Sequence, residues 1–130
     1  MTPRTPGNDD AGAQPPVWDA ATLPRMVGHD AGMHARMLEL FVRDAPGQIA
    51  AIEQAAGAGE LALAAGAAHT LKTSTRMVGA LRMGLLCEDI ETAADSAEAA
   101  QCRSLVGGLA DSYRRAQEHI RLQLPGDRPV

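Results

Sequence analysis

The sequence is poor in aromatic residues, in lysine and in clustered positive charge. Its 130 residues contain one Trp, one Tyr and one Phe, and Lys72 is the single lysine. Aromatic and β-branched runs, which favour strands, are missing, so a sheet is not expected. The net charge of -4 and the lack of any basic cluster argue against nucleic-acid binding, which requires a basic stripe facing the phosphates.

Long hydrophobic runs and paired cysteines are also missing. No apolar stretch is long enough to span a membrane, and the first residues, MTPRTPGNDDAGAQPP, lack the hydrophobic core of a signal peptide. Cys87 and Cys102 have no CxxC spacing, so we expect buried free thiols and neither a zinc site nor a disulfide framework. We therefore expect a cytoplasmic protein without a membrane segment.

The apolar residues that are present favour helices. They make up 45% of the sequence and are mostly Ala, Leu, Met and Val, of which Ala and Leu have high helix propensity. The length suits one domain, which we place at residues 17–124. Residues 1–16 combine Pro, Gly, Asp and Thr and are expected to be a disordered tail or linker, and residues 125–130 a C-terminal tail.

Apolar positions recur every three or four residues in four long segments. Asp30 is the expected N-cap of the first, in which Pro46 should cause a bend. The segments cover residues 30–56, 60–78, 80–94 and 100–123, and a short helix or a structured loop is expected at 17–27, carrying Trp18 and Leu23. The positions expected in the core are Met33, Met37, Leu38, Phe41, Ala45, Ile49, Ile52, Ala56, Leu61, Ala64, Ala68, Leu71, Thr75, Val78, Ala80, Met83, Leu86, Cys87, Ile90, Ala94, Leu105, Val106, Leu109, Tyr113, Ala116 and Ile120. The fold class is therefore all-α, an antiparallel up-and-down four-helix bundle with a short additional N-terminal helix.

His69 lies outside this core pattern. It follows the core position Ala68, so it is expected about 100° around the helix from the core, on an exposed face. Small residues and two cations share that face. The positions we assign to a docking surface for a partner are Ala65, Gly66, Thr73 and Arg76, with Lys72 beside His69.

This face fits a phosphoryl acceptor. A solvated histidine has a pKa of about 6.5, so its imidazole is mostly neutral and nucleophilic at neutral pH, and Lys72 and Arg76 favour that neutral form. The same cations attract a phosphoryl dianion. A merely solvated surface histidine is the alternative. Metal binding is disfavoured because no carboxylate lies three or four residues from His69, and a hydrolase because Ser74 and Thr75 lack a third triad member.

The segment from Ala68 to Glu91, AHTLKTSTRMVGALRMGLLCEDIE, resembles the signature of histidine-containing phosphotransfer (HPt) domains of multistep phosphorelays. The positions that match are Ala68, His69, Leu71, Lys72, Ser74, Gly79, Ala80, Leu86, Cys87 and Glu91. The resemblance implies that His69 is phosphorylated and that Lys72 contacts the phosphoryl group. Thr73 stands where the family usually has Gly, which predicts retained function with an altered fit to partners.

The resemblance also implies which domains are the partners, and it distinguishes the chain from the dimerisation domains of histidine kinases. Dimerisation domains of histidine kinases have an acidic residue after the histidine and a Pro five positions on, where this chain has Thr70 and Ser74. No nucleotide-binding box is present, so we expect a monomeric phosphocarrier and not an enzyme. It would exchange phosphoryl groups between aspartates of receiver domains, which supply the Mg²⁺. The chain could stand alone or be the C-terminal module of a hybrid histidine kinase, and a non-phosphorylated adaptor that docks receivers is the alternative function.

Overall fold

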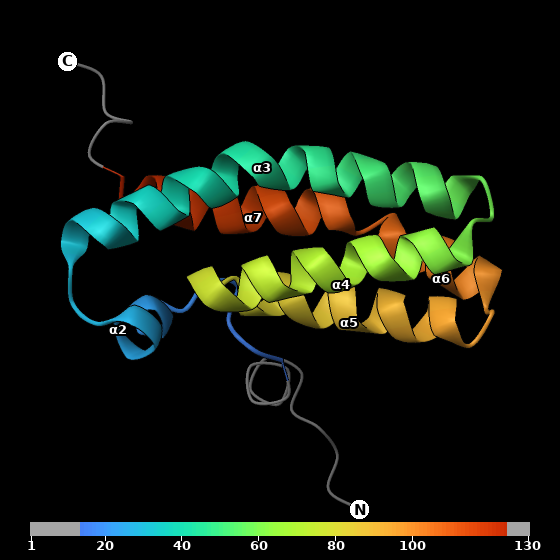
Figure 1. The fold of residues 1–130 in the computed structure, drawn as a ribbon, viewed down its shortest axis with the longest axis horizontal. Helices are drawn as coiled ribbons and strands as arrows, with labels where there is room; N and C mark the ends of the chain where they lie inside the picture. The colour runs from blue at the N-terminus through green and yellow to red at the C-terminus, as the bar shows by residue number, and fades with distance from the viewer. Residues whose placement is uncertain (1–13, 125–130) are drawn as a thin grey trace, which may run out of the picture.

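Helices account for most of residues 14–124, the part of the chain that the computed structural model describes. They are α2 (Thr22–Val27), α3 (Ala31–Gly57), α4 (Leu61–Val78), α5 (Leu81–Asp95), α6 (Ala99–Val106) and α7 (Leu109–Arg121). Figure 1 shows α3, α4, α5 and the α6–α7 pair running in alternating directions along one long axis. This arrangement confirms the predicted all-α antiparallel four-helix bundle. Of the tail predicted at 1–16, residues 1–13 lie outside the described residues, as does the whole C-terminal tail predicted at 125–130. Residues 14–16 are described, and the carbonyls of Pro15 and Pro16 accept hydrogen bonds from Arg82.

Helix α3 begins and continues as its sequence predicts. The Asp30 side chain accepts a hydrogen bond from the backbone N–H of Met33 at 3.1 Å, which satisfies one of the free donors of the first turn. Pro46 lies inside the helix and does not end it. Figure 1 shows α3 curving near its middle, as expected where proline removes a backbone hydrogen bond.

The core follows the predicted stripes, with exceptions at the edges. Its largest fully buried side chains include Ile52, Leu71, Met83, Ile90, Leu109 and Ile120. Met33 was expected in the core but is 44% exposed, because the first turns of α3 project beyond the end of α4 (Figure 1). The predicted core positions Met37, Leu61, Leu86 and Leu105 are only partly buried and pack at the rim of the bundle.

The predicted last helix is wrong as a single element. Instead of one helix from 100 to 123, the chain forms α6 and α7, separated at Gly107 and Gly108. Glycine loses more conformational freedom than other residues on entering a helix, so two in succession favour an interruption there. The two helices together still fill the fourth position of the bundle, because Cys102, Val106, Leu109 and Ile120 all face the core.

The segment before α2 lies against the turn between α4 and α5. The indole N–H of Trp18 donates to the carbonyl of Val78 at 2.9 Å, and the backbone N–H of Asp19 donates to the carbonyl of Gly79 at 2.8 Å. Arg82 donates from its side chain to Pro15 and from its backbone to Pro16. The helix is therefore shorter than the predicted 17–27, and the attached chain extends N-terminal of residue 17.

Gly79 makes this attachment possible. It ends α4 with φ of 95°, a left-handed conformation that residues with a Cβ rarely adopt. A Cβ at this position would also lie 2.5 Å from the carbonyl oxygen of Asp19. The turn that follows the histidine-bearing helix is therefore fixed by close backbone contact with the N-terminal segment.

Candidate functional site

The site forms where α4 and α5 pack closely. Gly84 of α5 faces Thr75 of α4, and a Cβ on Gly84 would lie 2.8 Å from the Thr75 hydroxyl oxygen. That hydroxyl is buried and donates to the carbonyl of Lys72 at 2.7 Å, so it is satisfied within its own helix. The close approach brings the carboxylates of α5 beside the cations of α4.

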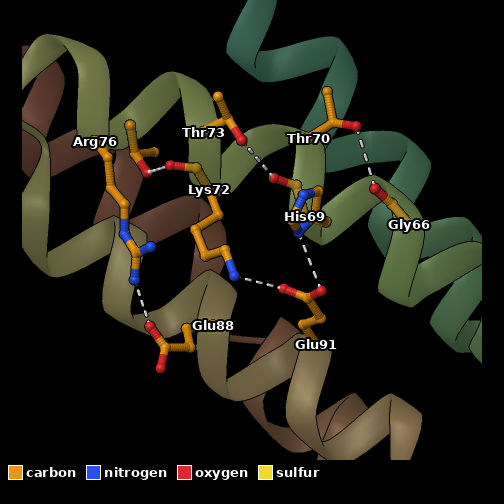
Figure 2. Close-up of polar contacts among 9 residues, drawn as sticks. Gly66, His69, Thr70, Lys72, Thr73, Arg76, Glu88 and Glu91 are labelled. Carbon is orange, nitrogen blue, oxygen red and sulfur yellow. Dashed lines mark hydrogen bonds and ion pairs between the residues drawn. The ribbon is translucent and has the colours of Figure 1, made fainter.

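His69 projects from the middle of α4, with 60% of its side chain exposed. Its Nδ1 lies 3.1 Å from Oε2 of Glu91 on α5. The other oxygen of the same carboxylate, Oε1, accepts a hydrogen bond from Nζ of Lys72 at 2.8 Å. Figure 2 shows Glu91 below both side chains, bridging them with its two oxygens.

Carboxylates from α5 balance both cations near His69. Arg76 forms an ion pair with Glu88 as Lys72 does with Glu91 (Figure 2). From the sequence, small residues and two cations were predicted on the face of His69, and that description is incomplete because two carboxylates of α5 also lie there. It considered neighbours on one helix only, and Glu91 is 22 residues away along the chain.

The carboxyl group of Glu91 is held ionised by its neighbours. The hydrogen bond from Lys72 lowers the pKa of Glu91 below its ordinary value most strongly, and the positive charge of Lys72 adds to this effect. An ionised carboxylate can only accept hydrogen bonds. Glu91 therefore accepts from both Lys72 and the His69 ring.

The predicted docking residues divide into exposed and buried ones. Gly66, Thr73 and Arg76 are exposed and lie on the same side of α4 as His69. Ala65 is only 8% exposed, so its assignment to the open face is wrong: it belongs to the buried core. The Thr73 hydroxyl donates to the carbonyl of His69 at 3.2 Å, so its hydrogen is used within its own helix.

A groove lies between the second half of α4 and α3. It has a volume of about 190 Å³ and is lined from α4 by Ser74, Met77 and Val78. The α3 side contributes Met37, Leu40, Phe41, Asp44, Ala45 and Gln48. The groove is mainly apolar, in contrast to the charged α5 side of His69.

Other chemistry finds little support in the described residues. Between residues 14 and 124, no group of three or more His, Cys, Asp or Glu side chains could hold a metal ion. Burial raises the pKa of the Cys87 thiol to about 12, so it is protonated at neutral pH and a poor nucleophile. Both cysteines are free and buried, as predicted. No helix in residues 14–124 is long and apolar enough to cross a membrane.

Comparison with known proteins identifies a family. The family model described as Hpt domain matches residues 36–119, which include His69, Lys72 and Glu91. No curated protein and no solved structure matches. The match covers more than half of the chain, and the all-helical antiparallel bundle of the structure agrees with the family assignment. The chain therefore belongs to the Hpt domain family, the histidine phosphotransfer modules of phosphorelays, which act with receiver domains and contain no kinase domain.

Proposed function

We propose that His69 is the residue that carries the phosphoryl group. The observation that carries this proposal is the combination of an exposed ring, 60% accessible, with a fixed orientation through the Glu91 carboxylate. Accessibility is needed because the aspartyl phosphate of another protein must reach the ring. A fixed orientation reduces the entropy lost in aligning the nucleophile with phosphorus.

The transfer needs no cofactor held by this chain. A ring nitrogen of His69 attacks phosphorus as the bond between phosphorus and the aspartate oxygen of a receiver breaks. The electron pair of that bond leaves with the aspartate carboxylate, and the reverse sequence delivers the group to a second receiver. We propose that the receiver supplies the Mg²⁺ that neutralises charge on the phosphoryl oxygens.

Lys72 is the proposed contact for the phosphoryl group. Its side chain is only 15% exposed, and its ammonium group binds the same carboxylate as the His69 ring. It is therefore held next to the ring and partly screened from water. A cation in this position stabilises negative charge that accumulates on the phosphoryl oxygens during transfer.

The surface around His69 is the proposed docking site for both receivers. Gly66 and Thr73 offer little bulk near the ring, and the groove between α4 and α3, lined by Met37, Leu40 and Met77 among others, offers a mainly apolar surface. Methionine side chains adapt to different neighbours, which suits a surface that must bind more than one partner. We propose that the carrier is a monomer in the cytoplasm, where free thiols such as Cys87 persist.

The test is phosphoryl acceptance by the full chain and by His69→Gln. Incubation with a panel of labelled phospho-receivers should transfer an acid-labile label to the wild type and none to His69→Gln. Because the substituted side chain is exposed, its melting temperature should change little. The matched control is His119→Gln on α7, which is also exposed and should accept label normally.

Two outcomes would contradict the proposal. Label on the His69→Gln variant would show that another residue is phosphorylated. Binding of receivers by the wild type with no label from any of them would instead support the alternative of a docking adaptor.

A further inference from the structure

Helix α4 changes composition at His69. The eight residues before it, Leu61–Ala68, are Leu, Ala and Gly, and none of them has a hydroxyl group. Four of the six residues in Thr70–Thr75 have one. Threonine has a lower helix propensity than alanine, so helix stability does not account for this run. Residues that work against their own helix are expected where a surface has a function.

The exposed hydroxyl groups of this run bond back to their own helix. Thr70 donates to the carbonyl of Gly66 and Thr73 to the carbonyl of His69, each at 3.2 Å (Figure 2). Both threonines are exposed. Bonds of this kind go to carbonyls that the helix already uses, and they do not strengthen it. The hydrogen of each hydroxyl is therefore occupied, and what its oxygen offers to a partner is its lone pairs.

Thr75 shows the contrasting, structural use of the same group. Its hydroxyl donates to the carbonyl of Lys72 at 2.7 Å, but the residue is fully buried and faces Gly84 of α5. Packing between α4 and α5 accounts for Thr75. It does not account for Thr70 and Thr73, because both are exposed.

The two exposed threonines form a row on one side of His69. At about 100° per residue, Thr73 lies about 40° and Thr70 about 100° around α4 from the histidine, in the same direction. Lys72 lies about 60° away in the opposite direction, toward α5. Ser74, about 140° around on the side of the threonines, lines the groove between α4 and α3. The row therefore separates the charged α5 side of the site from a mainly apolar groove.

We propose that the hydroxyl oxygens of Thr70 and Thr73 accept hydrogen bonds from a docking receiver, and that they favour receivers presenting N–H donors beside the phospho-aspartate. This inference rests on the proposed docking of receivers at His69. A hydroxyl that donates a hydrogen bond is polarised by it, so its oxygen accepts more strongly. A receiver carboxylate could bind there only after the hydroxyl gives up its bond to the helix. An apolar side chain would leave the oxygen buried without a donor.

The experiment titrates the full chain with unphosphorylated receiver domains and measures affinity by calorimetry. Thr70→Val and Thr73→Val retain the shape of the side chain and lose the hydroxyl, whereas Thr70→Ser and Thr73→Ser retain the hydroxyl. For the receiver that the wild type binds most tightly, each Val variant should bind about three- to ten-fold more weakly, the scale of one hydrogen bond. Each Ser variant should bind nearly as the wild type does, and the double Val variant should bind more weakly than either single one.

The loss should fall on binding more than on transfer. Single-turnover transfer from a saturating phospho-receiver should slow less in the Val variants than their affinity falls, because the hydroxyls contact the receiver and not phosphorus. Valine and threonine have similar helix propensities, so circular dichroism and melting curves should match those of the wild type. The matched control is Thr92→Val, which is exposed on α5, lines a pocket between α5 and α6, and should bind receivers normally.

Three results would overturn the proposal. The first is equal affinity of the Val variants and the wild type for every receiver tested. The second is weak binding by the Ser variants with normal binding by the Val variants, which would assign the contact to the threonine methyl groups. The third is a slower transfer at saturation with unchanged affinity, which would place the hydroxyls at the phosphoryl group.

Failure of the proposed function looks different. In that case the wild type accepts no label on His69 from any phospho-receiver. The affinities of the Val and Ser variants for unphosphorylated receivers still decide the role of the two threonines, because that measurement involves no transfer.

Discussion

Lys72 must exchange one anion for another if it serves the phosphoryl group. In the free protein its ammonium group lies 2.8 Å from Glu91, and the arriving phosphoryl oxygens compete with that carboxylate. Because the side chain is only 15% exposed, solvent screens this competition less than it would on an open surface. The contribution of Lys72 should therefore appear in the transfer step.

We expect Lys72→Ala to slow transfer by roughly ten-fold or more, since one charge-assisted contact is worth about 1.5 to 3 kcal/mol. Lys72→Arg should recover part of the rate, because guanidinium differs from ammonium in shape and reach. Single-turnover rates at saturating receiver measure the effect, and receiver affinity is measured separately. Equal losses of rate and affinity would assign Lys72 to docking instead.

Residue by residue, the sequence predicts only part of this site. The exposed position of His69 follows from its phase next to Ala68, which is fully buried. The bridge through Glu91 could not be derived from spacing, because it depends on the rotation of α5 against α4. The signal that could have found it is the occurrence of Glu91 within the matched HPt motif, to which no role was attached. Ala65 was misplaced because its position at the margin of the exposed arc is decided by packing.

Helix α4 contains two glycines with opposite roles. Gly66 lies in the helix interior, one turn before His69, and a Cβ there would meet no atom within 4 Å. Gly79 ends the helix at φ of 95° and touches Asp19. One glycine is open to substitution and the other is required by backbone geometry.

We therefore expect Gly66→Ala to raise the free energy of unfolding by up to about 1 kcal/mol through higher helix propensity. Gly79→Ala should lower it by about 1 to 3 kcal/mol, from left-handed strain and the clash with Asp19. Urea unfolding followed by circular dichroism measures both. Destabilisation by Gly66→Ala would show an unrecognised packing role for that position, and an unaffected Gly79→Ala would show that the turn can rearrange.

Element types were more predictable than their boundaries. The apolar residues of α3, α4 and α5 recur every three or four positions, so the face of each helix that meets the core could be predicted. Asp30 marks the start of α3 through its side-chain cap, and Gly79 marks the end of α4 through its left-handed conformation. The interruption at Gly107 and Gly108 was missed, because the apolar period continues through it from Val106 to Leu109. Periodicity records which side faces the core and does not report whether the backbone between two core residues is helical.

Over the whole molecule, paired carboxylates link folding to pH. The pKa values of Asp19, Glu91 and Asp111 are lowered, chiefly by hydrogen bonds from the Ala21 backbone, Lys72 and Arg114 respectively. A lowered pKa means that the unfolded chain binds protons more readily than the native one. The resulting stability is complete above the unfolded pKa values of about 4 and is lost as pH falls through the lower native values.

Melting temperatures should therefore change little between pH 7 and 5 and decline steadily below pH 4. The melting temperature of the Lys72→Met variant should change less over the acid range than that of the wild type, because the substitution removes the main cause of the lowered pKa of Glu91. Scanning calorimetry across this range measures both proteins. A wild-type melting temperature that is constant down to pH 2 would contradict the assignment of these ion pairs.

The single exposed ring on α4 limits the proposed relay to one bound receiver at a time. Donor and acceptor must cover the same face, so they cannot be bound together, and the carrier holds one phosphoryl group at a time. Each cycle then waits for a spent donor to depart before an acceptor can take its place. The overall rate of transfer would depend on the relative abundance of the two receivers and on their dissociation rates. An excess of unphosphorylated donor would therefore slow the relay by occupying the face of His69, without any change in the chemistry at that residue.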